Sequence, residues 1–131
     1  MILDSNLILS DAQDASTAGF SENIIDTVEV GDAVNELYFV AYVETECAGT
    51  GSLEVKLITN DENDTTIGNW ETLWSSGAVP VANLKDKYCF GMIRLPKPEK
   101  VKRYIGAEIA PTGITSGKLD IYLTGNPQTN I

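Results

Sequence analysis

The sequence predicts an all-β fold, namely an antiparallel jelly roll or β-sandwich of about eight strands in a single domain. Apolar and polar residues alternate with a period of two over many short stretches, as they do in half-buried strands. Turn residues separate these stretches at the intervals expected of a sandwich or barrel. Helical periodicity is nearly absent, and 131 residues is the length of one ordinary domain.

The first third of the chain is predicted to contain three strands. Residues 7–9 are expected to form a short strand, followed by a loop over the small polar stretch 10–19. Residues 24–30 are expected to form the second strand. The third, residues 37–43 (LYFVAYV), is apolar on both faces, so we expect both faces to be covered. The cover is either a loop such as residues 10–23 or a neighbouring subunit.

The two most regular alternations lie in residues 52–57 and 118–123. In each, an aliphatic residue takes every second position, and polar residues or a tyrosine take the others. Each is therefore predicted to be a strand with one face in the core and one face in water. Glycine-containing turns are predicted before both strands, a hairpin turn at residues 49–51 and a second turn at residues 113–117.

The remaining elements follow from the same signals. An acidic loop is predicted at residues 60–64 and one helical turn at residues 79–85. Leu95, Pro96, Lys97 and Pro98 are predicted to form a stiff extended segment. Three further strands are predicted at residues 70–75, 88–95 and 101–110.

The predicted domain spans residues 1–131, with residues 1–20 as an N-terminal arm and residues 125–131 as a flexible tail. The opening Met1-Ile2-Leu3-Asp4 has an acid where a secretion signal has bases. No apolar run approaches the roughly 18 residues of a membrane span. We therefore expect a soluble protein that is not secreted by that route and does not insert into a membrane.

Composition excludes several classes of function. The chain has 19 acids and 9 bases, a net charge of −10, which repels phosphate backbones and argues against a nucleic-acid partner. Histidine is absent, so serine or cysteine nucleophiles with a histidine base are excluded. Cys47 and Cys89 lack a metal or redox spacing and are expected to be buried free thiols. We expect no enzyme, no cofactor and no metal, although the acidic loop 60–64 has oxygen ligands of the kind that calcium prefers.

Charge is distributed unevenly along the chain. Residues 1–64 contain fourteen acids and one base, a net of −13, whereas the remainder has eight bases and five acids, a net of +3. Seven of the bases fall within residues 85–103. Either folding interleaves the two halves and the charges only solvate the surface, or a basic edge meets an acidic surface on a partner.

A carbohydrate-binding jelly roll is the alternative function. Trp70 and Trp74 are four residues apart, which places both on one face of a regular strand. That face is either part of the core or a platform on which sugar rings stack. Tyr42 and Tyr122 are further candidates for such a platform. An enzyme that uses carboxylates alone is a third interpretation.

Two parts of the chain resemble a known family. The opening MILDSNLILSDAQ, the segment RYIG at residues 103–106, and the turn 113–117 leading into KLDIYL at residues 118–123 resemble the small capsid cement (decoration) proteins of tailed bacteriophages. The resemblance covers the first dozen residues and roughly residues 100–124. Between them only the rhythm of strands agrees.

The resemblance implies a jelly-roll structural protein on the outer surface of the virion, made in the host cytoplasm. It implies a homo-oligomer, dimer or trimer, that clamps adjacent subunits of the major capsid protein and catalyses nothing. We expect two contact regions, an apolar N-terminal arm of residues 1–9 that pairs with a neighbour and the basic stretch 94–103 against an acidic capsid surface. Met1, Ile2 and Leu3 alternatively cap the core. The predicted interface residues are Met1, Ile2, Leu3, Leu7, Arg94, Lys97, Lys100, Lys102 and Arg103.

Overall fold

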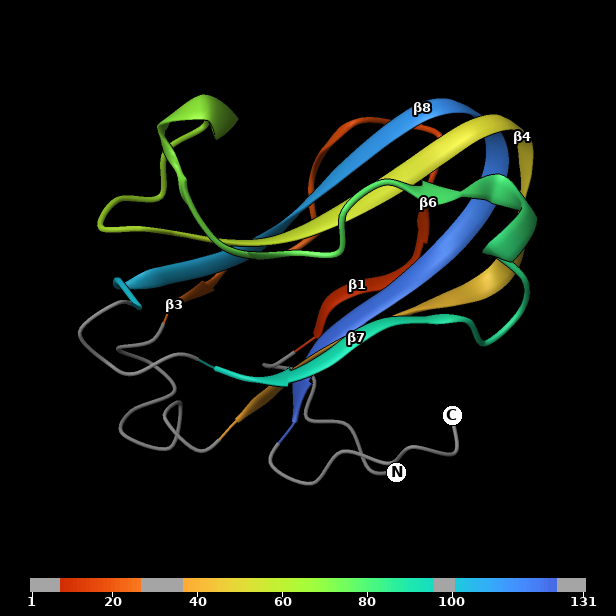
Figure 1. Cartoon of the computed structure of the whole chain (residues 1–131). Coiled ribbons are helices and arrows are strands. Elements are labelled where there is room, and N and C mark those ends of the chain that lie inside the picture. Colours follow the sequence, from red (N-terminus) through yellow and green to blue (C-terminus); the bar gives the residue numbers. More distant parts are fainter. Residues whose placement is uncertain (1–7, 27–36, 96–100, 125–131) are drawn as a thin grey trace.

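The computed structural model describes residues 8–26, 37–95 and 101–124 of the chain. These ranges contain antiparallel strands and two short 3-10 turns (Figure 1). None of the helical turns among them has the length or apolar character of a membrane-spanning helix. The elements are β1 (Ile8–Asp14), β2 (Gly19–Phe20), β3 (Ile25–Asp26), β4 (Tyr38–Asn60), η3 (Ile67–Asn69), β5 (Glu71–Ser75), β6 (Val79–Pro80), η4 (Val81–Asn83), β7 (Cys89–Arg94) and β8 (Tyr104–Thr124).

A long two-stranded ribbon of β4 and β8 organises the fold (Figure 1). The two strands pair from Tyr38 opposite Thr124 to Asn60 opposite Tyr104. Between Val43 and Ser52 the register shifts four times, and there the ribbon bends. Because the bend brings one half of the ribbon over the other, each long strand contributes to two facing layers.

The two layers have the strand order of a jelly roll. Layer A consists of β1, the C-terminal half of β8, the N-terminal half of β4, and β7. Layer B consists of β2 and β3, the N-terminal half of β8, the C-terminal half of β4, and β5 with β6. Counting each half of a long strand once along the chain, the orders are 1-8-3-6 and 2-7-4-5. The predicted all-β jelly roll is therefore confirmed.

One apolar core fills the space between the layers. Alternate residues of β4 and β8 point inward from both halves of the ribbon and are fully buried, as the period of a strand requires. Full burial of one such aliphatic or aromatic side chain contributes about 1.5–3 kcal/mol. The inward residues include Phe39, Leu53, Val55, Leu57, Leu119, Ile121 and Leu123. The prediction that the aliphatic residues of the segments 52–57 and 118–123 face the core is therefore confirmed.

The predicted turns at residues 49–51 and 113–117 are wrong, because both segments lie inside continuous strands. A Cβ atom on Gly49 would lie 2.1 Å from the carbonyl oxygen of Gly113, and one on Gly51 would lie 1.7 Å from that of Thr112. The glycines therefore serve close packing of two backbones at the bend. Glycine clusters occur both in turns and where two backbones cross closely, so the local sequence does not distinguish the two structures.

The N-terminal region also differs from its prediction. Residues 10–14, expected in a loop, continue β1 and pair with residues 118–121. Small polar residues are tolerated there because β1 is an irregular edge strand, with two register shifts and a left-handed Ala12 (φ 52°). Residues 8–14 and 19–20 of the expected arm are thus part of the sheet. Of the predicted strand 24–30, only Ile25 and Asp26 are strand within the described residues.

The other predicted elements are found near their expected positions. The strands expected at residues 70–75 and 88–95 are β5 and β7, and the one expected at residues 101–110 begins at Tyr104. The helical turn expected at residues 79–85 is η4. The tail 125–131 lies outside the described residues.

Candidate functional site

The outer side of layer A carries a row of apolar side chains that does not belong to the core. Phe39, Ala41 and Val43 of β4 point into the core, so Tyr38, Val40 and Tyr42 point outward. Neighbouring strands extend this side with residues that are paired to them in register. We call this surface the tyrosine face and define it by Ile8, Tyr38, Val40, Tyr42, Met92 and Tyr122.

Register aligns four of these residues across the whole layer. Val40 pairs with Tyr122 of β8 and with Met92 of β7, and Tyr122 pairs with Ile8 of β1. Val40 is fully buried and Tyr122 is 3% exposed, so the prediction that Tyr122 points into water is wrong. Its ring packs edge-on against Tyr42, with centroids 6.1 Å apart.

The described part of the expected cover does not lie over this face. Residues 10–14 pair along the edge of β8, and residues 19–20 pair with the other half of β8 in layer B. Between them, Ala15 donates its N–H to the carbonyl of Gly117, also on β8. The loop therefore follows an edge of the sheet, and the prediction that it covers the 37–43 strand is wrong.

A polar network fixes the tyrosine face at its border with β1. The Tyr42 hydroxyl donates a hydrogen bond to the Asp120 carboxylate. Its Oδ1 also accepts the backbone N–H of Ala12, 2.7 Å away, which the left-handed conformation of Ala12 directs toward β8. Burial, together with the hydrogen bond to Asp120 and the charge of Asp120, raises the pKa of Tyr42 well above its usual range.

This pKa shift predicts an alkaline sensitivity. The folded chain keeps Tyr42 neutral above pH 10, whereas an unfolded tyrosine ionises near pH 10. The contribution of neutral Tyr42 to the free energy of unfolding is therefore fully present below about pH 10 and is lost as the pH rises toward the folded pKa. The free energy of unfolding should fall above about pH 10 in the wild type and less steeply in Tyr42→Phe. Urea unfolding from about pH 8 to pH 11 measures both slopes. Equal slopes in the wild type and Tyr42→Phe would contradict the raised pKa of Tyr42.

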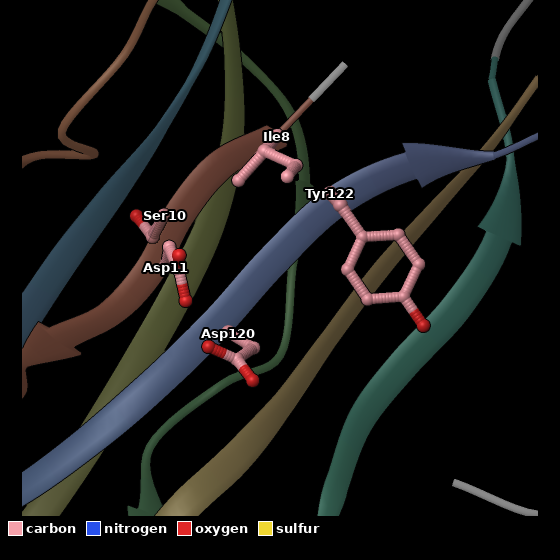
Figure 2. Close-up of a pocket in the computed structure, with 5 residues that line it drawn as sticks. All are labelled: Ile8, Ser10, Asp11, Asp120 and Tyr122. Carbon is pink, nitrogen blue, oxygen red and sulfur yellow. The ribbon is translucent and has the colours of Figure 1, made fainter. Parts of the chain in front are cut away.

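A small hollow lies beside this network. It is lined by Ile8, Ser10, Asp11, Asp120 and Tyr122, and its volume is about 70 Å³. Figure 2 shows the carboxylates of Asp11 and Asp120 on neighbouring strands, and the ring of Tyr122 directed away from β1 toward β4. Ligand pockets measure about 300–1,000 Å³, so this hollow is too small to enclose a small-molecule substrate.

The two tryptophans do not share a face. The pairing of β5 with β4 shifts between Leu57 opposite Trp74 and Ile58 opposite Thr72. Trp74 therefore packs in the core against Phe39, with ring centroids 5.7 Å apart. On the other side of this shift, Trp70 is 7% exposed, lies outside the core cluster and packs edge-on against Phe20. The prediction of one shared face is wrong because a β-bulge reverses the alternation.

Trp70 instead anchors the acidic loop 60–64. Its Nε1–H donates to the backbone carbonyl of Asp64 at 2.9 Å. The Asp64 carboxylate accepts the backbone N–H of Thr66 at 2.7 Å and the side-chain N–H of Asn69 at 2.9 Å, and these bonds hold its pKa below the usual value. In the described part of the chain, no three His, Cys, Asp or Glu residues converge as a metal site would require.

Two of the predicted interface cations form ion pairs within the chain. The Arg103 guanidinium binds Asp26 in a bidentate manner, with N–O distances of 3.1 and 2.9 Å. The Lys102 ammonium lies 3.5 Å from Glu71 and 4.0 Å from Asp61. Asp26 and Asp61 belong to the acidic half of the sequence, so folding interleaves the two halves at these positions.

The third described cation is on a different strand. Arg94 is exposed and ends β7 in layer A, whereas Lys102 and Arg103 precede β8 where it enters layer B. The structure therefore does not place these three cations on one strand. The other predicted interface residues, namely Met1, Ile2, Leu3, Leu7, Lys97 and Lys100, lie outside the described residues.

The cysteines are both free. Cys47 is buried, as expected, and burial raises the pKa of its thiol. Cys89 is exposed, so the prediction that both thiols are buried is half right. Cys89 pairs with Tyr42, which places it beside the tyrosine face, where an edge strand leaves it open to solvent.

No family model matches the chain, and no curated protein is found to be similar to it. The tyrosine face is therefore assigned as a candidate site from the geometry alone. Sequence reasoning identified its central strand and both Tyr42 and Tyr122, and it included Ile8 in the N-terminal contact arm, but it missed Met92. Neither Ile8 nor Met92 has a chemical signature, and only the register of β1 and β7 brings them into the row.

Proposed function

We propose that the protein is a cement protein of a tailed-phage head, which binds adjacent major capsid subunits on the outer surface of the shell. A cement protein acts by mass action, since it binds assembled subunits and not separated ones, and so stabilises the assembled state. The function requires a stiff scaffold and an exterior contact surface. It requires no catalytic group.

The main support for this proposal is the position in the fold of the two segments that resemble cement proteins. Residues 8–13 of the first part form β1, and residues 118–123 of the second part are in β8. These strands are direct neighbours, with Ile8 opposite Tyr122 and Gln13 opposite Leu119. These two segments, separate in the sequence, therefore form one continuous piece of layer A, whereas the resembling segment 103–106 lies at the start of β8 in layer B.

The composition of the tyrosine face supports the proposal. Tyrosine and methionine are enriched in protein–protein interfaces, where both give a large contact area. Val40 and Tyr122 are held in place by the packed row, whereas Tyr38, Tyr42 and Met92 remain partly exposed. We propose that these three side chains contact the capsid.

Net charge is compatible with this role. At −10 the free protein repels other copies and nucleic acid, which favours solubility before attachment and disfavours adhesion to DNA. Attachment at many symmetry-related positions lets modest individual contacts add up across the shell.

Binding to purified heads that lack the protein tests the proposal. The wild-type chain should bind at stoichiometric occupancy, and Tyr42→Ser should weaken binding at least tenfold, as expected when an aromatic interface residue is truncated. Tyr104→Ser is the matched control, because Tyr104 is also half-buried but lies in layer B. Sedimentation of the heads followed by quantification of the bound chain measures both.

Failure of the wild-type chain to bind any head preparation would sink the proposed function. Binding that is weakened by Tyr104→Ser and not by Tyr42→Ser would keep the function but assign it to another surface. Both variants must unfold with an unchanged cooperative transition, so that loss of binding is not loss of fold.

A further inference from the structure

Two carboxylates meet on the outer side of layer A, at the border of the tyrosine face. The pairing of β1 with β8 shifts between Ser10 opposite Ile121 and Gln13 opposite Leu119, which sets Asp11 and Ala12 against Asp120. Oδ1 of Asp120 accepts the backbone N–H of Ala12, the chain neighbour of Asp11, at 2.7 Å. Both carboxylates line the small hollow beside the tyrosine face (Figure 2).

This pair of charges is not neutralised within the described part of the chain. Neither Asp11 nor Asp120 forms an ion pair there. The carboxylate of Glu22 accepts the backbone N–H of Asp11 at 2.9 Å and adds to the negative charge. Lys118 lies on the same side of β8 but is opposite Asp14. Like charges on neighbouring strands repel each other, so the pair costs the free protein stability.

The hollow is suited to the end of one long basic side chain. Its volume of about 70 Å³ is too small to enclose a small-molecule substrate. In the residues that the structure describes, no three His, Cys, Asp or Glu side chains converge as a metal ion requires. Lysine and arginine combine an apolar stem with a charged end. The apolar Ile8 and Tyr122 match the stem, and the acidic Asp11 and Asp120 match the charge.

We propose that the hollow receives a basic side chain of the protein that docks on the tyrosine face, and that Asp11 and Asp120 bind its cation. Charge complementarity selects this occupant. Arginine suits the site best, because its planar guanidinium has five N–H donors and bonds to two carboxylates at once. The inference rests on the proposed function, since the docked protein is then the major capsid protein, whose contact surface supplies the cation.

The two carboxylates have different parts in this site. A carboxylate accepts about four hydrogen bonds. Asp120 uses one position for the N–H of Ala12 and one for the hydroxyl of Tyr42, so it is held in place and still has acceptor positions for a cation. Asp11 is exposed, and its carboxylate accepts no hydrogen bond within the described residues. Asp120 is therefore the fixed half of the site and Asp11 the open half.

Replacing Asp11 with asparagine should have different effects on stability and on binding. The change keeps the shape of the side chain and removes its charge. Because repulsion between neighbouring strands falls, the urea midpoint should be unchanged or higher. Affinity for purified heads that lack the protein should fall about tenfold, because the partner's cation loses a charged acceptor. A lower urea midpoint would show that Asp11 supports the fold, and would overturn the inference.

Glu62→Gln is the matched control for the binding experiment. Glu62 is an exposed carboxylate of the acidic loop after β4, far along the chain from the hollow, and its replacement changes the net charge by the same amount. This variant should bind heads like the wild type. Added salt should weaken both of them more than it weakens Asp11→Asn. Equal affinities of Asp11→Asn and Glu62→Gln would overturn the inference and leave the proposed function intact.

A small probe tests the hollow without a capsid. Acetyl-arginine amide should shift the backbone amide signals of Ala12 and Asp120 in NMR spectra of the free chain. Acetyl-citrulline amide has nearly the same shape without the charge and should shift them less. Asp11→Asn should reduce the arginine effect, whereas Glu62→Gln should not. Equal shifts from the two probes would overturn the inference even if heads bind the chain, and arginine-specific shifts would support it even if they do not.

Discussion

Replacing Gly51 with alanine is expected to prevent the chain from folding into its jelly roll. The new Cβ atom would lie 1.7 Å from the carbonyl oxygen of Thr112 and 2.7 Å from its carbonyl carbon. Both atoms belong to the backbone of β8, so no side-chain rotation relieves the clash. Separating β4 from β8 at the bend would open the junction between layers A and B.

The expected loss is at least about 4 kcal/mol of unfolding free energy, a large share of the roughly 5–15 kcal/mol that holds a domain together. Urea unfolding followed by circular dichroism measures it, or loss of soluble protein if folding fails. Gly68→Ala is the matched control, since a Cβ atom at Gly68 has nothing within 4 Å. It should change stability by less than about 0.5 kcal/mol. Equal stabilities of the two variants would contradict the backbone crossing.

Replacing Phe39 with alanine is expected to cost about 3–5 kcal/mol of unfolding free energy. Phe39 is fully buried between the layers and packs against Trp74. Its removal takes a large apolar surface out of the core and leaves a cavity that neighbouring strands cannot fill, because the sheet fixes their spacing.

Tyr38→Ala is the matched control for this prediction. Tyr38 precedes Phe39 on β4 but points outward and is half-buried, so its truncation should cost clearly less. Chemical denaturation of the two variants under the same conditions compares the two faces of one strand. A larger loss in Tyr38→Ala would mean that the inward and outward sides of β4 are assigned the wrong way round.

The sequence predicts the strands whose pattern is local. Leu53, Val55 and Leu57 alternate with polar residues, and alternation alone specifies that one face of a strand meets the core. The η4 turn and strand β7 follow from equally local signals. These features were predictable because neighbouring residues along the chain decide them.

The candidate surface was only partly predictable. The apolar segment 37–43 predicts a strand that is covered on both faces, and Tyr42 lies on the outer face. Met92 joins it because β7 pairs with β4 in one particular register, and Tyr122 is buried because it meets Tyr42 across a strand boundary. Register depends on residues far apart in the chain, which a pattern along the chain does not contain.

The sequence by itself therefore determined the all-β class, the inward faces of the two regular strands and the absence of histidine chemistry. Only the tertiary structure decided that the glycines at residues 49–51 bend a ribbon, and that a bulge turns Trp70 and Trp74 to opposite sides of layer B. The physical reason is the same in both cases. Side-chain alternation is a property of one strand, whereas crossings and bulges arise where two strands meet.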